Sequence, residues 1–538
     1  MNIRTNTRWH PMEAVAALAI VAMVATGCSG PESPGQNKDG FTGSAVGPVP
    51  AAAQEIMDQE PYRTARWTYQ VSELESGKLL MANRPNEMVF TASSAKQFTV
   101  GSAYELLGPD SRLTTPVYAV GQRAGNVLRG NLVLVASGDL TMGGRNALED
   151  RVDSSFTATT TDHVYGDVAP NAVKPPGDPL EGLDDLAEQI AATGIRTVDG
   201  HVLIDDRLWE TFDGQEGPVP PIFINDNLLD ITVTPAKPGQ PATAAASPQT
   251  SAYQVESSVR TVSGSEASLT VTADPLEPRR LLLTGKIGVD AGPRLTVYRV
   301  PDAVAWARTL FVEALARAGI DVRPNGNPAD LPARDSYRPA QPVASIQSPP
   351  LSAFGTMILQ TSYNTGANAL LCLLAVHEGS TDCIDGLTPM RRVIEKAGLI
   401  SADVVLVDGQ GADPASVTPA QMVNWLRWTQ NQPWGALFKA GQPVLGESGS
   451  LAAYGAGSPA KGKIAAKTAT SMQPDPATGR ALFNVQGLAG FMTTDDGREL
   501  VFHLAMSGGT YPDVLTGLNQ AGNDLAEVAA AFQQQLSR

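Results

Sequence analysis

The chain has 538 residues, of which 42% are hydrophobic and 17% are charged, a composition that is ordinary for a folded globular protein. This composition excludes a disordered or fibrous chain, and the length predicts two or three domains. The formal net charge of −16 argues against a nucleic-acid-binding protein, because a phosphate backbone requires a basic face.

The first 27 residues have the features of an export signal. Arg4 and Arg8 precede an apolar run from Ala14 to Ala25, which is too short to span a bilayer and has the size of a signal-peptide core. Small residues ahead of Cys28 resemble a bacterial lipobox, in which this cysteine is acylated and becomes the mature N-terminus. We predict a signal peptide with a lipobox over residues 1–27 and an exported protein of the cell envelope or periplasm. Its membrane contact would be a lipid anchor at Cys28; an ordinary secreted protein is the alternative.

Residues 28–58 begin rich in Pro, Gly and Ser and are predicted to be a flexible tether. Two strand-like runs, 65–73 and 78–83, then flank a Ser-Gly pair and predict a hairpin. Helical periodicity follows from about Ser93 to Leu107 and stops at a Gly-Pro pair.

The middle of the chain, residues 112–298, consists mostly of short strand-like runs and turns. One clear helical stretch, 180–193, interrupts it. After it, the pattern predicts a helix over 302–318, a long apolar helical stretch over 351–376 that is broken near 361–364, and a helix over 419–429. Strands over 463–467, 485–493 and 500–506 and a last helix within 515–535 follow.

Helices and strands at both ends around a β-rich middle predict an α+β domain that is split by a large insertion. We expect the domain in two parts, 59–111 and 299–538, with inserted β-rich domains over 112–298.

Cys372 and Cys383 are the two cysteines that follow the predicted lipobox. In an exported chain such a pair predicts a disulfide that closes a short loop, and two buried free thiols are the alternative. Neither cysteine has a histidine at metal-ligand spacing, so we expect no metal site.

Ser93-Ser-Ala-Lys96 opens the first predicted helix. Residues i and i+3 share a helix face, so the Lys96 amine can reach the Ser93 hydroxyl, which needs an adjacent base to act as a nucleophile. A partly desolvated lysine has a lowered pKa and suits this role. The same spacing recurs at Ser458 and Lys461, but in a Gly/Pro-rich stretch that we interpret as a loop.

Two further patterns carry polar groups. Ser362-Tyr-Asn364 lies at the break in the long helical stretch, where its side chains would relay a proton and hold a carbonyl, or would cap a helix. Lys467-Thr468-Ala-Thr470 closes a strand-like run and suits a terminal carboxylate, with an exposed lysine on an edge strand as the alternative.

Ser-x-x-Lys, Ser-x-Asn and Lys-Thr-(small), in this order, resemble the motifs of the penicillin-binding proteins and serine β-lactamases. The gap between the first two is longer than a typical domain, as in the class C low-molecular-mass penicillin-binding proteins, which are D-alanyl-D-alanine carboxypeptidases and endopeptidases. The segments 130–141, 408–419 and 487–494 are similar to further segments of that family.

The resemblance implies a serine β-lactamase/transpeptidase-like fold and a role for each motif residue. Ser93 would attack the carbonyl between two D-alanines, Lys96 would take its proton, and Ser362 would pass a proton to the leaving D-alanine. The substrate would be bound by Asn364, Lys467, Thr468, Thr470 and, through a basic group on the stem peptide, Asp139. The implied ligands are peptidoglycan peptides and β-lactams, with no cofactor and no metal.

Three departures from the family pattern, Ala469 for glycine, Gln410 for serine and Asn368 for an acidic residue, leave a catalytically weak or inactive peptidoglycan-binding relative as the alternative function. A Ser-His-Asp hydrolase would need a Gly-x-Ser-x-Gly elbow, which the sequence lacks. A compact β-lactamase would not accommodate so long a first gap.

Overall fold

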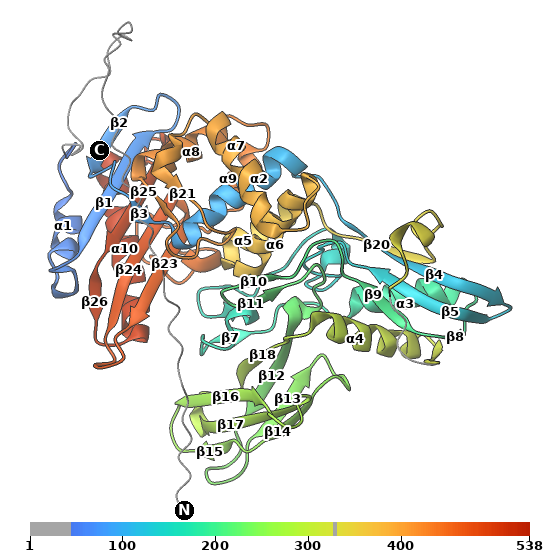
Figure 1. The fold of residues 1–538 in the computed structure, drawn as a ribbon. Helices are drawn as coiled ribbons and strands as arrows, with labels where there is room; N and C mark the ends of the chain where they lie inside the picture. Colours follow the sequence, from blue (N-terminus) through green and yellow to red (C-terminus); the bar gives the residue numbers. More distant parts are fainter. Residues whose placement is uncertain (1–44, 326–330, 538) are drawn as a thin grey trace, which may run out of the picture. The chain divides into compact units, whose positions relative to one another are not determined.

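The central sheet joins the two ends of the folded chain (Figure 1). The computed structural model describes residues 45–325 and 331–537, so the predicted signal peptide and Cys28 lie outside it. The strand order is β2-β1-β25-β24-β23, with β26 paired to β24, and all these pairings are antiparallel. The strands are β1 (Arg66–Glu73), β2 (Leu79–Asn83), β23 (Ile464–Pro474), β24 (Ala481–Thr493), β25 (Glu499–Ser507) and β26 (Gly509–Tyr511). The hairpin predicted over 65–83 is confirmed by β1 and β2.

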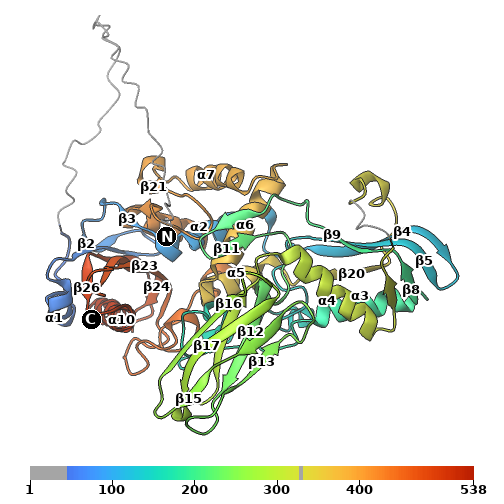
Figure 2. The same cartoon turned by 60° about the horizontal axis from the view of Figure 1, so that its bottom comes forward.

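Side chains of the central sheet alternate between two cores, as the period of two in a strand requires. Along β24 and β25, Leu488 and Phe502 belong to a core shared with α1 (Ala51–Met57) and α10 (Val514–Leu536), visible together in Figure 2. Ala489 and Val501 face the opposite core, which a second set of helices covers. These are α2 (Lys96–Leu107), α5 (Leu351–Thr361), α6 (Asn364–His377), α7 (Leu387–Lys396), α8 (Pro419–Gln430) and α9 (Gly435–Ala440).

Folded structure begins earlier than the predicted tether boundary at residue 58. Helix α1 spans Ala51–Met57, its Ala53 is fully buried, and the helix packs against α10. A flexible tether therefore has to end ahead of α1.

A second sheet lies in the middle of the chain, in the order β19-β8-β5-β4-β20 with β9 paired to β5. Its strands are β4 (Thr114–Ala124), β5 (Val127–Val135), β8 (Thr197–Asp199), β9 (Val202–Asp205), β19 (Asp321–Arg323) and β20 (Ala344–Gln347). It shares a core with the predicted helix α3 (Glu181–Ala192) and with α4 (Ala303–Arg317). Because α4, β19 and β20 belong to this core, we propose that the insertion ends after β20 rather than at residue 298.

The insertion also contains two smaller sheets and two short ladders. One sheet has the order β13-β12-β18; in the other, β17 lies between β14 and β15 and also pairs with β16. Their strands are β12 (Leu228–Thr234), β13 (Thr243–Ser247), β14 (Gln254–Ser257), β15 (Arg260–Val262), β16 (Ala267–Ala273), β17 (Arg280–Gly288) and β18 (Arg294–Arg299). The ladders join β6 (Thr161–Asp162) to β7 (Ala172–Val173) and β10 (Phe212–Gly214) to β11 (Gly217–Val219). Outside the insertion, β3 (Val89–Phe90), β21 (Val404–Val405) and β22 (Ser416–Val417) form a small sheet. Strand β3 directly precedes the turn of the predicted nucleophile.

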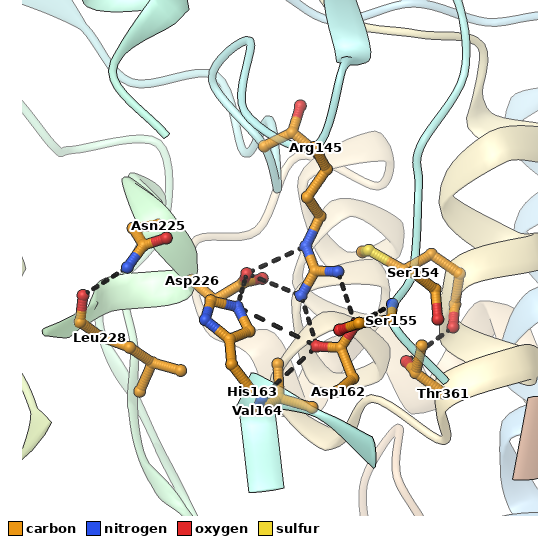
Figure 3. A network of polar contacts seen from close by, with 12 residues as sticks. Arg145, Ser154, Ser155, Asp162, His163, Val164, Asn225, Asp226, Leu228 and Thr361 are labelled. Carbon is orange, nitrogen blue, oxygen red and sulfur yellow. Dashed lines mark hydrogen bonds and ion pairs between the residues drawn. The ribbon is translucent and has the colours of Figure 1, made fainter. Parts of the chain in front are cut away.

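An ionic network is buried inside the insertion (Figure 3). The Arg145 guanidinium donates to Asp162 at 2.8 and 2.9 Å and to Asp226 at 2.9 and 3.0 Å. His163 lies between Asp226, at 2.8 Å, and Asp230, at 2.9 Å. Burial alone would lower the pKa of His163, but the two carboxylates raise it to about 9, so the ring is protonated and both its nitrogens donate. The network joins β6, the adjoining turn and β12 by charge.

Removing the guanidinium of Arg145 is expected to destabilise the insertion strongly. The Arg145→Met variant leaves the carboxylates of Asp162 and Asp226 buried without their cation, a loss of about 3–5 kcal/mol. The urea midpoint of the corresponding unfolding transition measures it. The control is Arg317→Met, which breaks a half-exposed pair with Asp184 and should cost less than about 1 kcal/mol. Equal losses in the two variants would contradict the assignment.

Candidate active site

The turn that carries Ser93 leads directly into helix α2. The helix predicted from Ser93 begins with a 3₁₀ turn, Ala92–Ala95, as helices often do, and α2 proper starts at Lys96. Lys96 Nζ donates a hydrogen bond to Ser93 Oγ at 2.8 Å. The structure therefore brings together the nucleophile and the base that the spacing predicts.

The backbone ahead of Ser93 is pressed against the segment Asp408–Gly411. Ala92 has a φ of 40°, in the left-handed region. A Cβ atom added to Gly411 would lie 1.9 Å from the carbonyl oxygen of Ala92. Only glycine fits at position 411 without a shift of the backbone. Asp408 Oδ1 accepts hydrogen bonds from the amides of Gln410 and Gly411, at 3.1 and 2.7 Å, and so fixes this close approach.

Lys96 is fully buried and its amine donates to three acceptors. Besides Ser93 Oγ, these are Asn364 Oδ1 at 2.5 Å and the Gln410 carbonyl at 3.1 Å. Burial lowers the pKa of Lys96 to about 8, against the charges of Glu216 and Asp408, which raise it. A fraction of the amine is thus neutral near pH 7 and can accept the proton of the hydroxyl.

The break between α5 and α6 presents the Ser-x-Asn motif. Ser362 ends α5 with a φ of 60°, and Asn364 begins α6, which confirms the break predicted near 361–364. Ser362 Oγ accepts from Lys467 Nζ at 2.9 Å, and its carbonyl accepts from Tyr165 Oη at 2.8 Å. Ser362 is the C-cap residue of α5, where its backbone caps the helix, while the side chains of Ser362 and Asn364 bond to Lys467 and Lys96.

Strand β23 carries the third motif at the edge of the central sheet. The strand continues past Lys467 to Pro474, so the strand end predicted at Lys467 is wrong; Thr468 and Thr470 are β-branched residues that suit a strand. The lysine is fully buried rather than exposed, and Thr468 Oγ1 lies 2.8 Å from Ser450 Oγ. Thr470 Oγ1 donates to Gln486 at 2.9 Å, and β23 packs against the turn of Ser93.

Both lysines of the site are fully buried, and the charge of one acts on the other. Burial, followed by the charge of Lys96, holds the pKa of Lys467 well below its usual range. A carboxylate that entered beside Lys467 would offset both effects. The site is therefore electrostatically suited to an anionic group at the Lys467 end.

Ala469, in place of the family's glycine, points away from open space. It is 2% exposed and packs with Val89, Ala92 and Val485 under the turn of Ser93. Its partner across the ladder is Gly487, which leaves room for the extra methyl group.

The other two departures contact each other. Asn368 Nδ2 donates to Gln410 Oε1 at 3.3 Å, while Asn368 Oδ1 accepts from the amide of Gly409 at 2.9 Å. A neutral amide pair thus stands where the family has a hydroxyl and often a carboxylate. The carbonyl of Gln410 still accepts from Lys96.

Asp139 lies in the insertion, where its carboxylate organises a turn. Its Oδ1 accepts from the amides of Thr141 and Met142, at 2.9 and 3.1 Å, and burial raises its pKa. The residue is 2% exposed, and its recognition of a basic group stays a prediction.

The remaining sequence candidates are also placed. Cys372 and Cys383 are joined by a disulfide that ties α6 to the following turn. Ser458 and Lys461 lie in turns outside any helix, which confirms the interpretation of this second Ser-x-x-Lys as a loop.

Sequence reasoning missed several residues that contact the motifs. Tyr165 and Glu216 come from the insertion and hydrogen-bond to Ser362 and Asn364, and Ser450 contacts Thr468. None of them stands in a recognisable motif, and only the folded chain brings them to the site.

Comparison with known proteins places the chain in a family. A model of the D-Ala-D-Ala carboxypeptidase 3 (S13) family matches residues 50–528. A D-alanyl-D-alanine carboxypeptidase of Actinomadura sp. (strain R39) is 26% identical over 486 residues, which cover 85% of this chain and 81% of that one.

Solved structures share the fold. Penicillin binding protein 4 of Haemophilus influenzae matches with a TM-score of 0.67 and 18% identity, over 90% of this chain and 99% of that chain. The same protein in complex with a β-lactam matches with a TM-score of 0.63 and 18% identity, over 90% and 98% of the two chains. The predicted fold class, an α+β transpeptidase-like fold, and the resemblance to class C penicillin-binding proteins are confirmed. The chain belongs to the D-Ala-D-Ala carboxypeptidase 3 (S13) family and is a serine-type D-Ala-D-Ala carboxypeptidase.

Proposed function

We propose that the chain cleaves D-alanyl-D-alanine peptides of peptidoglycan through an ester on Ser93. The observation that carries the proposal is the 2.8 Å hydrogen bond from the buried amine of Lys96 to Ser93 Oγ. A pKa of about 8 gives this amine the two protonation states that a general base needs near neutral pH. Neither a metal nor an organic cofactor takes part in this chemistry.

Acylation begins when neutral Lys96 takes the proton of Ser93 and Oγ bonds to the carbonyl carbon between the two D-alanines. The backbone N–H groups of Ser93 and Thr470 stabilise the oxyanion, and the Asn364 amide positions the acyl part of the substrate. When the C–N bond breaks, Ser362 passes its hydroxyl proton to the leaving amine and takes a proton from Lys467 Nζ, which donates to its Oγ. Water then adds its hydroxyl to the acyl carbon and gives its proton back to Lys467, while Lys96 returns its proton to Ser93 as the ester C–O bond breaks.

The terminal carboxylate binds at Lys467 and Thr468. Burial, and then the charge of Lys96, keeps the pKa of Lys467 low in the free enzyme, and an entering carboxylate favours its charged form. Substrate binding then brings a proton to Lys467, whose Nζ bonds to Ser362 Oγ at 2.9 Å. This bond links the carboxylate to the group that protonates the leaving amine.

We further propose that the protein is exported and held at the membrane by a lipid on Cys28. The support is the signal-like sequence of residues 1–27 and the Pro-, Gly- and Ser-rich stretch that precedes the folded chain. Within residues 45–325 and 331–537, no helix has the length and apolarity needed to cross a bilayer.

A fluorescent penicillin is expected to form a covalent adduct on Ser93. Ser93→Ala should lose the adduct in intact-mass and gel measurements, because it removes the oxygen that bonds to the β-lactam carbonyl. Ser458→Ala, in the second Ser-x-x-Lys, is the matched control and should keep it. An adduct that persists in Ser93→Ala would refute the nucleophile, and no adduct in the unchanged protein would favour the inactive relative.

The purified protein is expected to release free D-alanine from monomeric muropeptides. The buried Lys467 end of the site suits the carboxylate of a terminal D-alanine. Chromatography of the products separates this activity from endopeptidase activity, which would instead convert cross-linked dimers to monomers. If neither product appears while the Ser93 adduct forms, the chain is a penicillin-binding protein without peptidase activity.

Ala469→Gly is expected to leave the acylation rate within about threefold of the unchanged protein. The methyl group is 2% exposed and packs beneath the Ser93 turn rather than facing a ligand. Its loss should instead cost about 1–2 kcal/mol of stability, through lost burial and the added freedom of glycine in a strand. Penicillin acylation kinetics and the melting temperature measure the two effects. A tenfold faster acylation would show that Ala469 restricts the site.

A further inference from the structure

A hairpin of the insertion, β10–β11, reaches the catalytic motifs with its tip. Its two tip residues make separate contacts: Gln215 Oε1 accepts from Gln410 Nε2 at 3.0 Å, and Glu216 Oε1 accepts from Asn364 Nδ2. Both strands of the hairpin pack against α6, the helix that Asn364 begins. The tip is therefore supported next to the residue that it contacts.

The amide of Asn364 is held at both of its ends. Its Oδ1 accepts from Lys96 Nζ at 2.5 Å, and its Nδ2 donates to the carboxylate of Glu216. A carboxylate only accepts hydrogen bonds, so Glu216 can be satisfied only by the NH₂ end of the amide. A charged Lys96 only donates and selects the same orientation, but it gains a lone pair when it becomes the neutral base. When Lys96 is neutral, only Glu216 of these two partners still requires the NH₂ end of the Asn364 amide to point toward it.

Two carboxylates act on the charge of Lys96. Glu216 on the inserted hairpin and Asp408 of the segment Asp408–Gly411 favour its charged form, and the charge of Lys96 in turn disfavours that of Lys467 on β23. Glu216 itself faces Arg299 Nη1 at 3.9 Å, but that guanidinium also bonds to Asp167 at 2.9 and 3.1 Å. The Glu216 side chain is 25% exposed, so its charge is only partly screened by water.

We propose that Glu216 is a positioning residue for the catalytic groups: its carboxylate fixes the orientation of the Asn364 amide, and its charge acts on Lys96. The second N–H of Asn364 Nδ2 is left for the carbonyl of the acyl group. The inference rests on the proposed function, since it assigns a role relative to Lys96 as the base. It makes the insertion part of the catalytic arrangement.

The charge of Glu216 has a predictable effect on the pH dependence of acylation. With a pKa of about 8, about one tenth of Lys96 is neutral at pH 7, and acylation rises with pH until the base is fully neutral. Glu216 raises this pKa, so removing its charge lowers it. The rising limb of the profile should then move to lower pH, while an amide free to flip should lower the plateau.

The test is the second-order rate of acylation by a fluorescent penicillin, measured on the full mature chain from pH 5.5 to 9.5. The unchanged protein should show a midpoint near pH 8. Glu216→Gln should move the midpoint down by about 0.5–1 pH unit and lower the plateau by about two- to tenfold. Asp213→Asn, at an exposed position of the same hairpin, is the matched control and should change neither.

A second pair of variants separates charge from packing. Glu216→Asp and Glu216→Asn shorten the side chain equally, so the midpoint of the Asn variant should again lie lower even if both lose stability. The proposal would be overturned if the unchanged protein and Glu216→Gln had equal midpoints and Glu216→Asp and Glu216→Asn also had equal midpoints. If the unchanged protein forms no Ser93 adduct at any pH, the proposed function fails instead, so the two failures are distinguishable.

Discussion

Two lysine amines are buried in one site, and the arrangement of the other groups follows from that constraint. Lys96 and Lys467 are both fully buried, which lowers the pKa of each amine, and the charge of Lys96 lowers that of Lys467 further. Each amine donates to a hydroxyl and a carbonyl. Lys96 donates to Ser93 Oγ and the carbonyl of Gln410, and Lys467 donates to Ser362 Oγ and the carbonyl of Thr468. The result is one lysine poised to lose its proton and one suited to gain a counter-ion. Acid–base chemistry and anion binding thus have a common physical origin.

The motif loop between α5 and α6 is held by the insertion as well as by its own domain. Tyr165 bonds to the carbonyl of Ser362, and Glu216 bonds to Asn364. Tyr363, the residue between Ser362 and Asn364, is 2% exposed. Burial, and then the charge of Asp226 of the network in Figure 3, raises the pKa of Tyr363. The left-handed residue Ser362 is thus bonded both by the insertion, through Tyr165, and by its own domain, through Lys467.

The motif residues could be predicted because each motif consists of residues close together in the sequence, on one turn, one helix break or one strand. Ser93 and Lys96 share a helical turn, and the break at Ser362 and the strand of Lys467 are visible in the hydrophobic pattern. The end that we propose for the insertion could not be predicted, because α4 and β20 have ordinary helix and strand patterns and only the structure shows which core they join. Glu216 lies in a short hairpin without a motif, and its role follows from a contact that is distant in sequence. The fit of Ala469 depends on the register that sets Gly487 opposite it.

The contact of the β10–β11 hairpin with Asn364 also affects whether the insertion can be removed from the split domain. Because Tyr165 and Glu216 complete the surroundings of Ser362 and Asn364, the two parts of the split domain, joined without the insertion, would lack part of the active site. Excision would expose the motif loop and remove a charge that acts on the base. The insertion and the split domain are thus expected to vary together in related chains, and exchanging insertions between relatives would transplant part of the catalytic electrostatics.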